Sequence, residues 1–394
     1  MNDETLRYKL LRPVRRRVAA RYRESRDLLS AYATLVEREL TVGRSLDVPW
    51  RRRVRLWRRG FTSRSDVLFD LDDDYGAFVS DLQHELTDGV TEPWDAVVNN
   101  KLTYYLLFSS FSRFLPGLYG VVDDGEVKRT APSMESLSQS VDGAVSVDTD
   151  RPGSFERAEA VPWIDAYLDA NEALVLKPIY GQGGGGVLVC RKPAGADGYV
   201  VNGERTGSGE FAAAVGDLEG YLAWEFAEQA EYAAELFPES TNTLRILTMW
   251  DYDADEPFVA GAVHRVGTER SAPVDNWSQG GLSAEVVEDG VLGDAAQWLP
   301  SEGVVRRYGT HPDTGTTIEG ARVPDWPRIR RLVLEIAAEF PSLPRLGWDV
   351  VHTGDGEFDV LEVNAHAATR TFQVHRPLLC DPRVRRFYRH HGCL

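Results

Sequence analysis

A glycine-rich stretch between two strand-like runs, ALVLKPIYGQGGGGVLVC at residues 173–190, most constrains what this chain can fold into. The apolar run before it delivers Lys177, and five glycines follow: Gly181, Gly183, Gly184, Gly185 and Gly186. Because glycine reaches positive φ without steric cost, successive N–H groups of such a loop can converge on an anion. The stretch therefore predicts a strand, a flap over phosphates and a second strand, with Lys177 adding a fixed positive charge.

Other nucleotide-binding glycine loops do not fit this stretch. Gly181, Gly183 and Gly186 satisfy the spacing G-x-G-x-x-G, but the dinucleotide fingerprint opens a helix, whereas VLVC after Gly186 reads as a strand. A Walker loop ends in Gly-Lys-Ser or Gly-Lys-Thr, and a protein-kinase loop comes with H-R-D and D-F-G motifs. The sequence has none of these signatures. For the loop taken alone, a flexible hairpin tip is the remaining alternative.

A second motif, RLGWDVVHTGDGEFDVLEVNAHAATR at residues 345–370, predicts a β-hairpin. Two strand-like runs flank Asp355-Gly356, which is a strong signal for a tight turn. With a two-residue turn the numbers of paired residues sum to 711, so Asp349 lies opposite Glu362. Asn364 shares their face, two positions along.

This hairpin predicts a metal site. Directly opposed carboxylates have Cβ atoms about 4.5–5.5 Å apart and repel each other, unless a cation lies between them. Two carboxylates and an amide oxygen are hard ligands suited to Mg²⁺, which also takes oxygens from phosphates. We expect Asp349, Glu362 and Asn364 to hold one or two Mg²⁺ ions, with Mn²⁺ as a possible substitute. The alternative is a solvent-facing acidic hairpin in an acidic protein.

The two motifs together resemble the ATP-grasp superfamily, whose members carry a lysine before a glycine-rich hairpin and a terminal Asp…Glu-x-Asn metal set. Intervening segments match in order over about residues 95–376. NNKLTYY contains Lys101, which resembles the first ATP lysine of the family. LAWEFAEQ at residues 222–229 resembles its strand and adenine hinge. TNTLRILT, GAVHRV and NWSQGG resemble the Arg, Arg and Asn-x-x-x-Gly-Gly elements of glutamate-ligase-like and cell-surface-polysaccharide-associated members.

The resemblance implies a role for each matching residue. Lys101 and Lys177 would bind the α and β phosphates of ATP. The hinge positions would be Glu225 and Ala227, with Glu228 or Glu231 as the ribose ligand.

Other implied positions concern the reaction itself. Arg245 and Arg265 would stabilise the transferred phosphoryl group and an acyl phosphate. Asn276 and Arg370 would contact substrate, although a structural role for Arg370 is the stronger alternative. One departure concerns the acceptor end of the site. Many amide-forming members follow Glu-x-Asn with a small residue, Pro and Gly, whereas Ala365-His366-Ala367 stands here.

The implied fold is α+β, an ATP-grasp fold in which two α+β subdomains clasp ATP, preceded by a basic helical segment. We expect a helical N-terminal region over residues 1–94 and an ATP-grasp domain over 95–394. Its first part, to about residue 225, carries the glycine flap, and residues 226–394 carry the metal ligands. Within this order, residues 71–82 predict a helix start, and Trp326 to Phe340 predicts a helix with Pro327 in its first turn.

The composition indicates the conditions in which the protein works. The 394 residues carry a net charge of -17, and only five of 44 basic residues are lysine. An acidic, lysine-poor chain indicates adaptation to high salt. Within such a chain, Lys101 and Lys177 occupy the two places where the family has lysines, and an ammonium contacts phosphate as a point charge. Three cysteines without metal spacing, and no secretory signal or long apolar run, favour a reducing cytoplasm.

Charge is unevenly distributed along the chain. Residues 1–60 contain 17 basic and 7 acidic residues, a net charge of +10, which leaves -27 for the remainder. Apolar residues from Leu6 to Val18 recur at helical spacing among arginines, and a second basic cluster runs from Arg51 to Arg59. We favour a helix docked on the acidic body over a membrane-surface or nucleic-acid patch, and we expect no nucleic-acid partner.

The activity that the resemblance implies is ATP-dependent ligation of a small-molecule carboxylate to an amine through an acyl phosphate, for example in making a cell-envelope precursor. A phosphotransferase with the same nucleotide site, or a protein that binds ATP without catalysis, are the alternatives. The sequence identifies neither the carboxylate nor the amine, because acceptor specificity resides in loops that no short motif encodes.

Overall fold

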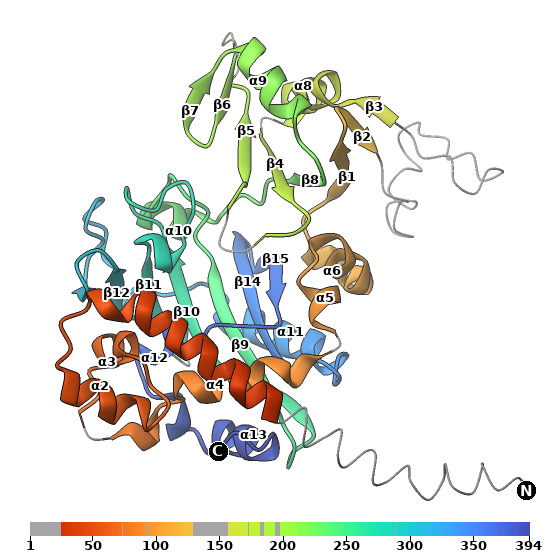
Figure 1. The fold of residues 1–394 in the computed structure, drawn as a ribbon. Helices are drawn as coiled ribbons and strands as arrows, with labels where there is room; N and C mark the ends of the chain where they lie inside the picture. The colour runs from red at the N-terminus through yellow and green to blue at the C-terminus, as the bar shows by residue number, and fades with distance from the viewer. Residues whose placement is uncertain are drawn as a thin grey trace, which may run out of the picture.

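The computed structural model describes residues 25–394 apart from 73, 93, 129–156, 172, 182–184, 194–197 and 288. Among these residues the strands form two antiparallel sheets. An eight-stranded sheet has the order β3-β2-β1-β8-β4-β5-β6-β7, and a seven-stranded sheet has the order β13-β12-β11-β10-β9-β14-β15. Figure 1 shows the first sheet in an upper lobe and the second in a larger lower lobe. The predicted α+β class is confirmed.

The upper lobe is built from residues 118–225. Its strands are β1 (Leu118–Asp123), β2 (Glu126–Lys128), β3 (Arg157–Glu159), β4 (Ala173–Pro178), β5 (Leu188–Arg191), β6 (Tyr199–Val201), β7 (Glu204–Thr206) and β8 (Tyr221–Glu225). Helices α8 (Ala160–Asn171) and α9 (Ser208–Gly216) pack on this sheet. Their apolar sides close a separate small core, formed by buried residues such as Ile164, Leu174, Leu176 and Phe211. The glycine stretch thus connects β4 to β5, as predicted.

The lower lobe contains β9 (Leu244–Asp251), β10 (Glu256–Val266), β11 (Leu282–Val286), β12 (Leu292–Leu299), β13 (Val304–Tyr308), β14 (Arg345–Gly354) and β15 (Glu357–Asn364). Helix α11 (Trp326–Ala338) covers the sheet with Ile329 and Val333, and Pro327 lies in its first turn as predicted. The remaining helices of this lobe are α10 (Glu231–Leu236), η6 (Trp277–Gln279), α12 (Arg370–Gln373), η7 (Leu378–Cys380) and α13 (Pro382–His390).

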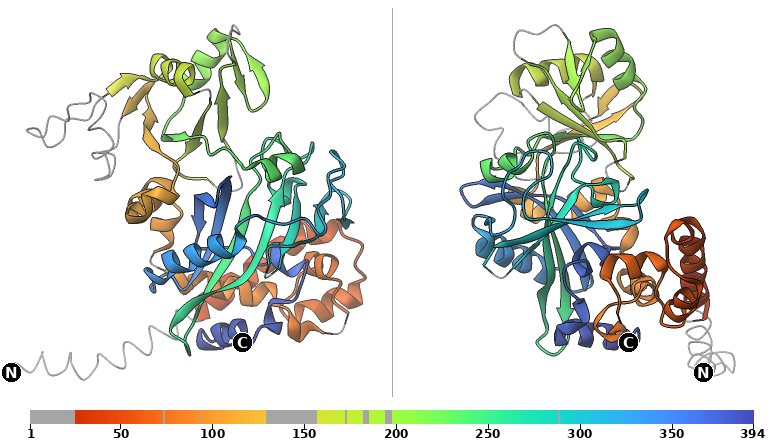
Figure 2. Two further views of the ribbon diagram at one scale, coloured as in Figure 1. Left: turned by 180° about the vertical axis from the view of Figure 1, so that it is seen from behind. Right: turned by 90° about the vertical axis from the view of Figure 1, so that its left-hand side faces the viewer.

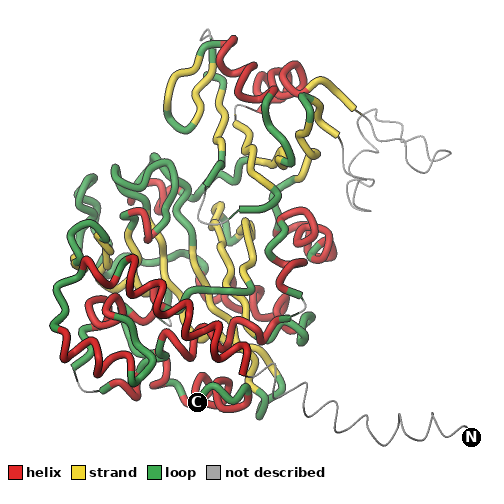
Figure 3. The backbone as a smooth tube through the Cα atoms, in the orientation of Figure 1, coloured by secondary structure: helices red, strands yellow, loops and turns green. Residues whose placement is uncertain are grey.

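Helices also precede the upper lobe. They are a helix over residues 25–41, η1 (Gly43–Ser45), α2 (Trp50–Trp57), α3 (Ser63–Phe69), η2 (Tyr75–Ala77), α4 (Asp81–Thr87), η3 (Asp88–Thr91), α5 (Asp95–Val98), α6 (Lys101–Leu107) and η4 (Ser109–Phe114). Figure 3 shows them in red beside and below the yellow strands of the lower lobe. Buried Leu56, Phe61 and Leu68 pack against Trp277 and Trp298, so this helical region shares a core with the lower sheet.

The N-terminal half differs from the sequence prediction at residues 71–82. A regular helix does not start at residue 71: η2 forms first, and α4 begins only after Ser80, whose side chain makes a capping box with Gln83. The basic segment from Leu6 to Val18 lies outside the described residues. The boundaries proposed at residue 94 and at about residue 225 stay predictions, and the second coincides with the end of β8. Among the described residues, no helix is long and apolar enough to span a bilayer.

Candidate functional site

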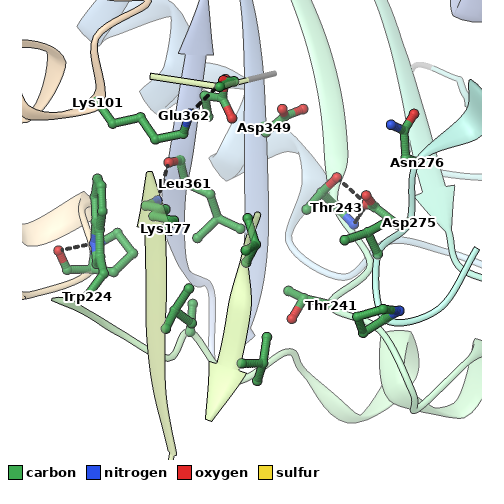
Figure 4. Close-up of a pocket in the computed structure, with 18 of the residues that line it drawn as sticks. Lys101, Lys177, Trp224, Thr241, Thr243, Asp275, Asn276, Asp349, Leu361 and Glu362 are labelled. Carbon is green, nitrogen blue, oxygen red and sulfur yellow. Dashed lines mark hydrogen bonds between the residues drawn. The ribbon is translucent and has the colours of Figure 1, made fainter. Parts of the chain in front are cut away.

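A cleft lies between the two sheets and is lined from both lobes (Figure 4). Most of the side chains singled out in the sequence meet here. The predicted residues that line it are Lys101, Lys177, Gly181, Gly185, Glu225, Ala227, Arg245, Arg265, Asn276, Asp349, Glu362 and Asn364. Residues up to 263 positions apart in the sequence therefore share one cleft.

The β14–β15 hairpin has the turn and the key pairing that the sequence predicts. Asp355 and Gly356 have φ of 51° and 74°, as a two-residue hairpin turn requires. Asp349 pairs with Glu362, and Asn364 pairs with Gly347 at the adjacent end of the ladder. The Asn364 amide lies 3.5 Å from Asp349 Oδ2, and the amide orientation that satisfies both of its ends donates to Glu362 Oε1 at 3.1 Å and accepts from Arg245 NH1 at 3.0 Å. The three predicted metal ligands are thus adjacent on one face.

Between the turn at Asp355-Gly356 and the predicted metal ligands, the pairing of β14 with β15 is not regular. The predicted register assumed that paired residue numbers sum to 711 along the whole hairpin. Its register shifts between Asp349 and Val350 and shifts back before Gly354, so Val350 pairs with Val360. This leaves Leu361 as an extra residue on β15. Its carbonyl oxygen accepts a hydrogen bond from Lys177 Nζ at 3.3 Å. The bulge therefore turns a backbone carbonyl toward a side chain of the other sheet.

The two lysines reach the cleft from different elements. Lys101 begins α6, where the Asn100 side chain caps the helix, and its Nζ donates to the Gly181 carbonyl at 2.8 Å. Lys177, on β4, lies with Nζ 3.2 Å from the centroid of the Trp224 ring. Burial lowers the pKa of Lys177 to about 7; Glu362 acts in the opposite direction and Lys101 in the same one. An anion in the cleft would favour its charged form.

A row of charges crosses the middle of the lower sheet. Arg245 on β9 pairs across the ladder with Asp349, and its Nε lies 2.8 Å from Asp349 Oδ1. Arg265 on β10 lies 3.4 Å from the same oxygen and 3.1 Å from Asp275 Oδ1. The Thr243 hydroxyl accepts from Arg265 at 2.8 Å and donates to Asp275 Oδ2 at 2.5 Å. Both guanidinium groups are therefore held in fixed orientations at the base of the cleft.

The donor set fits a hard divalent cation. Glu362 is only partly buried and makes no ion pair with any described residue. Asp349 Oδ1 is buried and lacks a hydrogen bond of normal geometry among the described residues, although Arg245 Nε is close. Two carboxylates and an amide side by side on paired strands are ligands that Mg²⁺ prefers. Asp349, Glu362 and Asn364 would hold it.

The hinge segment follows β8. The Glu225 N–H donates to the Gly117 carbonyl at 2.8 Å, and the Glu225 carboxylate accepts from the Gly117 N–H at 2.7 Å. Ala227 is buried in the cleft wall, and its backbone N–H and carbonyl bond to no described residue. They are thus available to a planar ligand with both a donor and an acceptor edge.

The remaining predicted residues lie elsewhere. Glu228 is exposed and does not line the cleft, and Glu231 is exposed at the start of α10. Arg370 donates to the buried Asp81 at 2.5 Å, which gives it a structural partner away from the cleft lining. Gly186 has φ of 77° but does not line the cleft, and Gly183 and Gly184 lie outside the described residues.

Four residues of this site were not singled out in the sequence. Trp224 stands in the LAWEF run and supports Lys177, while Leu361 precedes Glu362. Thr243 and Asp275 orient Arg265. Asp275 follows two apolar residues and stands directly before Asn276. This position next to a predicted site residue was the signal that could have identified it. Burial raises the pKa of Asp275, while Arg265 and Thr243 act to lower it.

A family model for sugar-transfer associated ATP-grasp proteins matches residues 94–384. The chain belongs to this family. The predicted ATP-grasp fold with a helical N-terminal segment is thereby confirmed, and the two ATP-grasp sheets enclose the cleft of Figure 4. No curated protein sequence matches the chain.

Solved structures that resemble this ATP-grasp chain include an ADP complex of N5-carboxyaminoimidazole ribonucleotide synthetase (11% identity, TM-score 0.35, covering 72% of this chain and 51% of that one). Others are the ATP-grasp ligase PsnB with a minimal precursor (12%, 0.34, 75% and 63%) and the D-alanine-D-alanine ligase from Coxiella burnetii (9%, 0.33, 79% and 60%). This chain spans less than two thirds of the length of each. At these TM-scores, none of their properties is transferred to it.

Proposed function

We propose that this protein is an ATP-dependent carboxylate–amine ligase, which forms an amide or peptide-like bond through an acyl phosphate. The observation that carries the proposal is the convergence of Lys101, Lys177, Arg245 and Arg265 with Asp349 and Glu362 in one cleft between two sheets. Cations from both lobes suit a triphosphate, and the carboxylates suit its metal. The description of the family as sugar-transfer associated supports a place in cell-surface polysaccharide biosynthesis.

The order of groups along the cleft supports one orientation for ATP. The unpartnered backbone of Ala227 would receive adenine, next to Glu225. Lys177 and Lys101, with the glycine loop that begins at Gly181, would contact the α and β phosphates. The terminal phosphate would then lie over the lower sheet, where Arg245 and Arg265 stand beside Asp349. The ribose ligand is not assigned, because Glu228 does not line the cleft.

Each charged residue then has a task in the transfer. Mg²⁺ between Asp349, Glu362 and Asn364 would neutralise phosphate charge and orient the terminal phosphoryl group. Arg245 and Arg265 would stabilise the negative charge that spreads over this group as the substrate carboxylate attacks, and would then bind the acyl phosphate. Because Thr243 and Asp275 hold Arg265 in place beforehand, little reorganisation accompanies the step. An amine then displaces phosphate to form the amide.

The first test is calorimetric titration of Mg-ATP into the purified full chain at molar KCl. We expect saturable binding by the wild type and its loss in a Lys177→Ala, Glu362→Ala double variant. The matched control is Lys128→Ala with Glu357→Ala, which removes a lysine and a glutamate that form ion pairs away from the cleft. Failure of the folded wild type to bind Mg-ATP, alone or with candidate acceptors, would overturn the nucleotide site.

Product chemistry separates ligation from its alternatives. A ligase releases ADP only when a carboxylate and an amine are both present, a phosphotransferase needs a single hydroxyl acceptor, and a binding protein makes no ADP. Screening pairs of carboxylates and amines for ADP release therefore tests the reaction class directly. ADP release with a lone hydroxyl compound and no amine would replace the ligase proposal by a phosphotransferase.

A further inference from the structure

The helix of residues 25–41 and α2 carry large apolar side chains that are exposed. On the helix of residues 25–41, one face packs inward through the buried Ala31 and Leu35. The neighbouring face is exposed. Together with two tryptophans of α2 it forms what we call the apolar patch, whose members and exposed fractions are Leu29 71%, Tyr32 46%, Val36 57%, Leu40 64%, Trp50 66% and Trp57 37%.

An ion pair brings the two helices together. Arg53 NH1 of α2 lies 2.7 Å from Glu39 Oε1 of the first helix, so the helices touch at this point. Trp50 and Trp57 are three residues before and four after Arg53, and therefore share its side of α2. Val36 is three residues before Glu39 and shares its side of the first helix. The exposed apolar groups of both helices thus flank the same contact.

Unpaired arginines border the tryptophans. Arg52 and Arg53 form ion pairs with Asp66 and Glu39. By contrast, the exposed Arg51, Arg55 and Arg58 form no ion pair with the described residues. Their spacing of four and three residues aligns them on one side of α2. This positive strip is unusual in a chain with a net charge of -17, and it belongs to the first 60 residues, which carry +10.

We propose that the apolar patch and the strip of Arg51, Arg55 and Arg58 dock the protein on an anionic lipid bilayer. Tryptophan and leucine side chains next to arginines suit the boundary between acyl chains and headgroups, where apolar groups enter and cations meet anionic lipid. At high salt the long-range attraction is screened, but the buried apolar area retains its contribution. Figure 2 places these helices beside the lower lobe, away from the upper sheet, so docking leaves the upper lobe free.

Other occupants fit the patch less well. A second copy in a two-fold contact would cover the apolar groups, but no member of the apolar patch offers an acidic partner to Arg51, Arg55 and Arg58. Nucleic acid would satisfy the arginines but would leave the exposed Leu29, Val36 and Leu40 in water. An anionic bilayer satisfies both parts of the surface.

Vesicle flotation with the full chain tests this inference. We expect the wild type to float with vesicles of equimolar phosphatidylglycerol and phosphatidylcholine, and to remain mostly unbound with phosphatidylcholine alone. A Trp50→Ala, Trp57→Ala variant should partition about tenfold or more weakly, because it loses two large apolar anchors. Each of Arg51→Gln, Arg55→Gln and Arg58→Gln should weaken partitioning by up to about fivefold.

Matched controls keep the test specific. Arg330→Gln with Arg331→Gln removes exposed arginines of α11, and Leu106→Ser removes an exposed leucine of α6. These controls should float like the wild type, and thermal melts should show that all variants are folded. Every variant retains the arginines of residues 1–24, so a selective loss reports on the patch. The proposal fails if the wild type does not float, if patch and control variants lose binding equally, or if light scattering shows a dimer that the patch variants dissociate.

Discussion

At the scale of single residues, the protonation of Lys177 should control nucleotide affinity. Since burial lowers its pKa to about 7, the ammonium that a phosphate needs is progressively lost above that pH. Each pH unit above 7.5 should therefore weaken Mg-ATP binding by up to about tenfold. Calorimetric titrations between pH 7 and 9.5 measure this slope. Lys177→Arg, whose guanidinium stays charged, should bind more weakly at pH 7 but with a flatter profile, and a slope that is unchanged in this variant would contradict the role of Lys177.

Also at this scale, Asp275 should contribute more to the free energy of unfolding than an exposed aspartate that is likewise paired with an arginine. Asp275→Asn removes the negative charge from a buried pair with Arg265, so we expect unfolding free energy to fall by about 3 kcal/mol. Asp294→Asn is the control, because its pair with Arg307 is about two-fifths exposed and should contribute less than about 1 kcal/mol. Urea unfolding of both variants measures the difference. Equal losses would show that Asp275 does not hold Arg265.

At the scale of elements, local patterns were predictable and contacts between distant segments were not. The turn at Asp355-Gly356 and the pairing of Asp349 with Glu362 follow from a two-residue loop and strand alternation. The bulge at Leu361 could not be predicted, because strand alternation carries no signal for an extra residue, and the contact of its carbonyl with Lys177 joins two different sheets. The orienting role of Asp275 likewise requires knowing that Thr243, directly before β9, is adjacent to Arg265 on β10.

Strand β14 offers a test of how closely the segment after Asn364 packs on the site. A Cβ atom added to Gly347 would lie 2.5 Å from Ala367 Cβ and 3.1 Å from Arg245 NH1. Gly347→Ala should therefore displace the loop and the guanidinium, lowering stability by about 1–3 kcal/mol and weakening Mg-ATP turnover. Gly293→Ala on β12 is the control, because its Cβ would meet nothing closer than 3.8 Å. Measurements of unfolding free energy and of ADP release should both distinguish the two variants. If Gly347→Ala has no effect on either, the loop that carries Ala367 moves aside without cost.

At the scale of the whole molecule, the order of motifs was sufficient to predict the fold and to bring residues from both lobes to one cleft. The contacts that dock the N-terminal helices were not readable, because both the apolar cluster with Trp277 and Trp298 and the buried polar contacts join segments that are far apart in the sequence. Arg370 illustrates this. The resemblance suggested a substrate contact, with a structural role as the stronger alternative, and its guanidinium pairs with Asp81, which also accepts hydrogen bonds from the Thr62 and Ser65 side chains. Asp81 thereby joins α3, α4 and α12.

Because of Asp81, the free energy of unfolding of the whole protein should depend on pH in the acid range. Burial would raise its pKa, but Arg370 and the hydrogen bonds from Thr62 and Ser65 outweigh this and lower the pKa to about 2. A carboxylate with a depressed folded-state pKa stabilises the protein fully above its unfolded value near 3.8, and the contribution disappears as pH falls through about 2. The shift corresponds to about 2 kcal/mol.

Asp81→Asn should lower unfolding free energy at pH 7 by about 3 kcal/mol, because it leaves Arg370 without its buried counter-charge. Between pH 4 and 2 the variant should lose less stability than the wild type, whereas Asp253→Asn, at an exposed ion pair with Arg386, should follow the wild type throughout. Parallel acid profiles for wild type and Asp81→Asn would show that this carboxylate does not couple the N-terminal helices to the lower lobe.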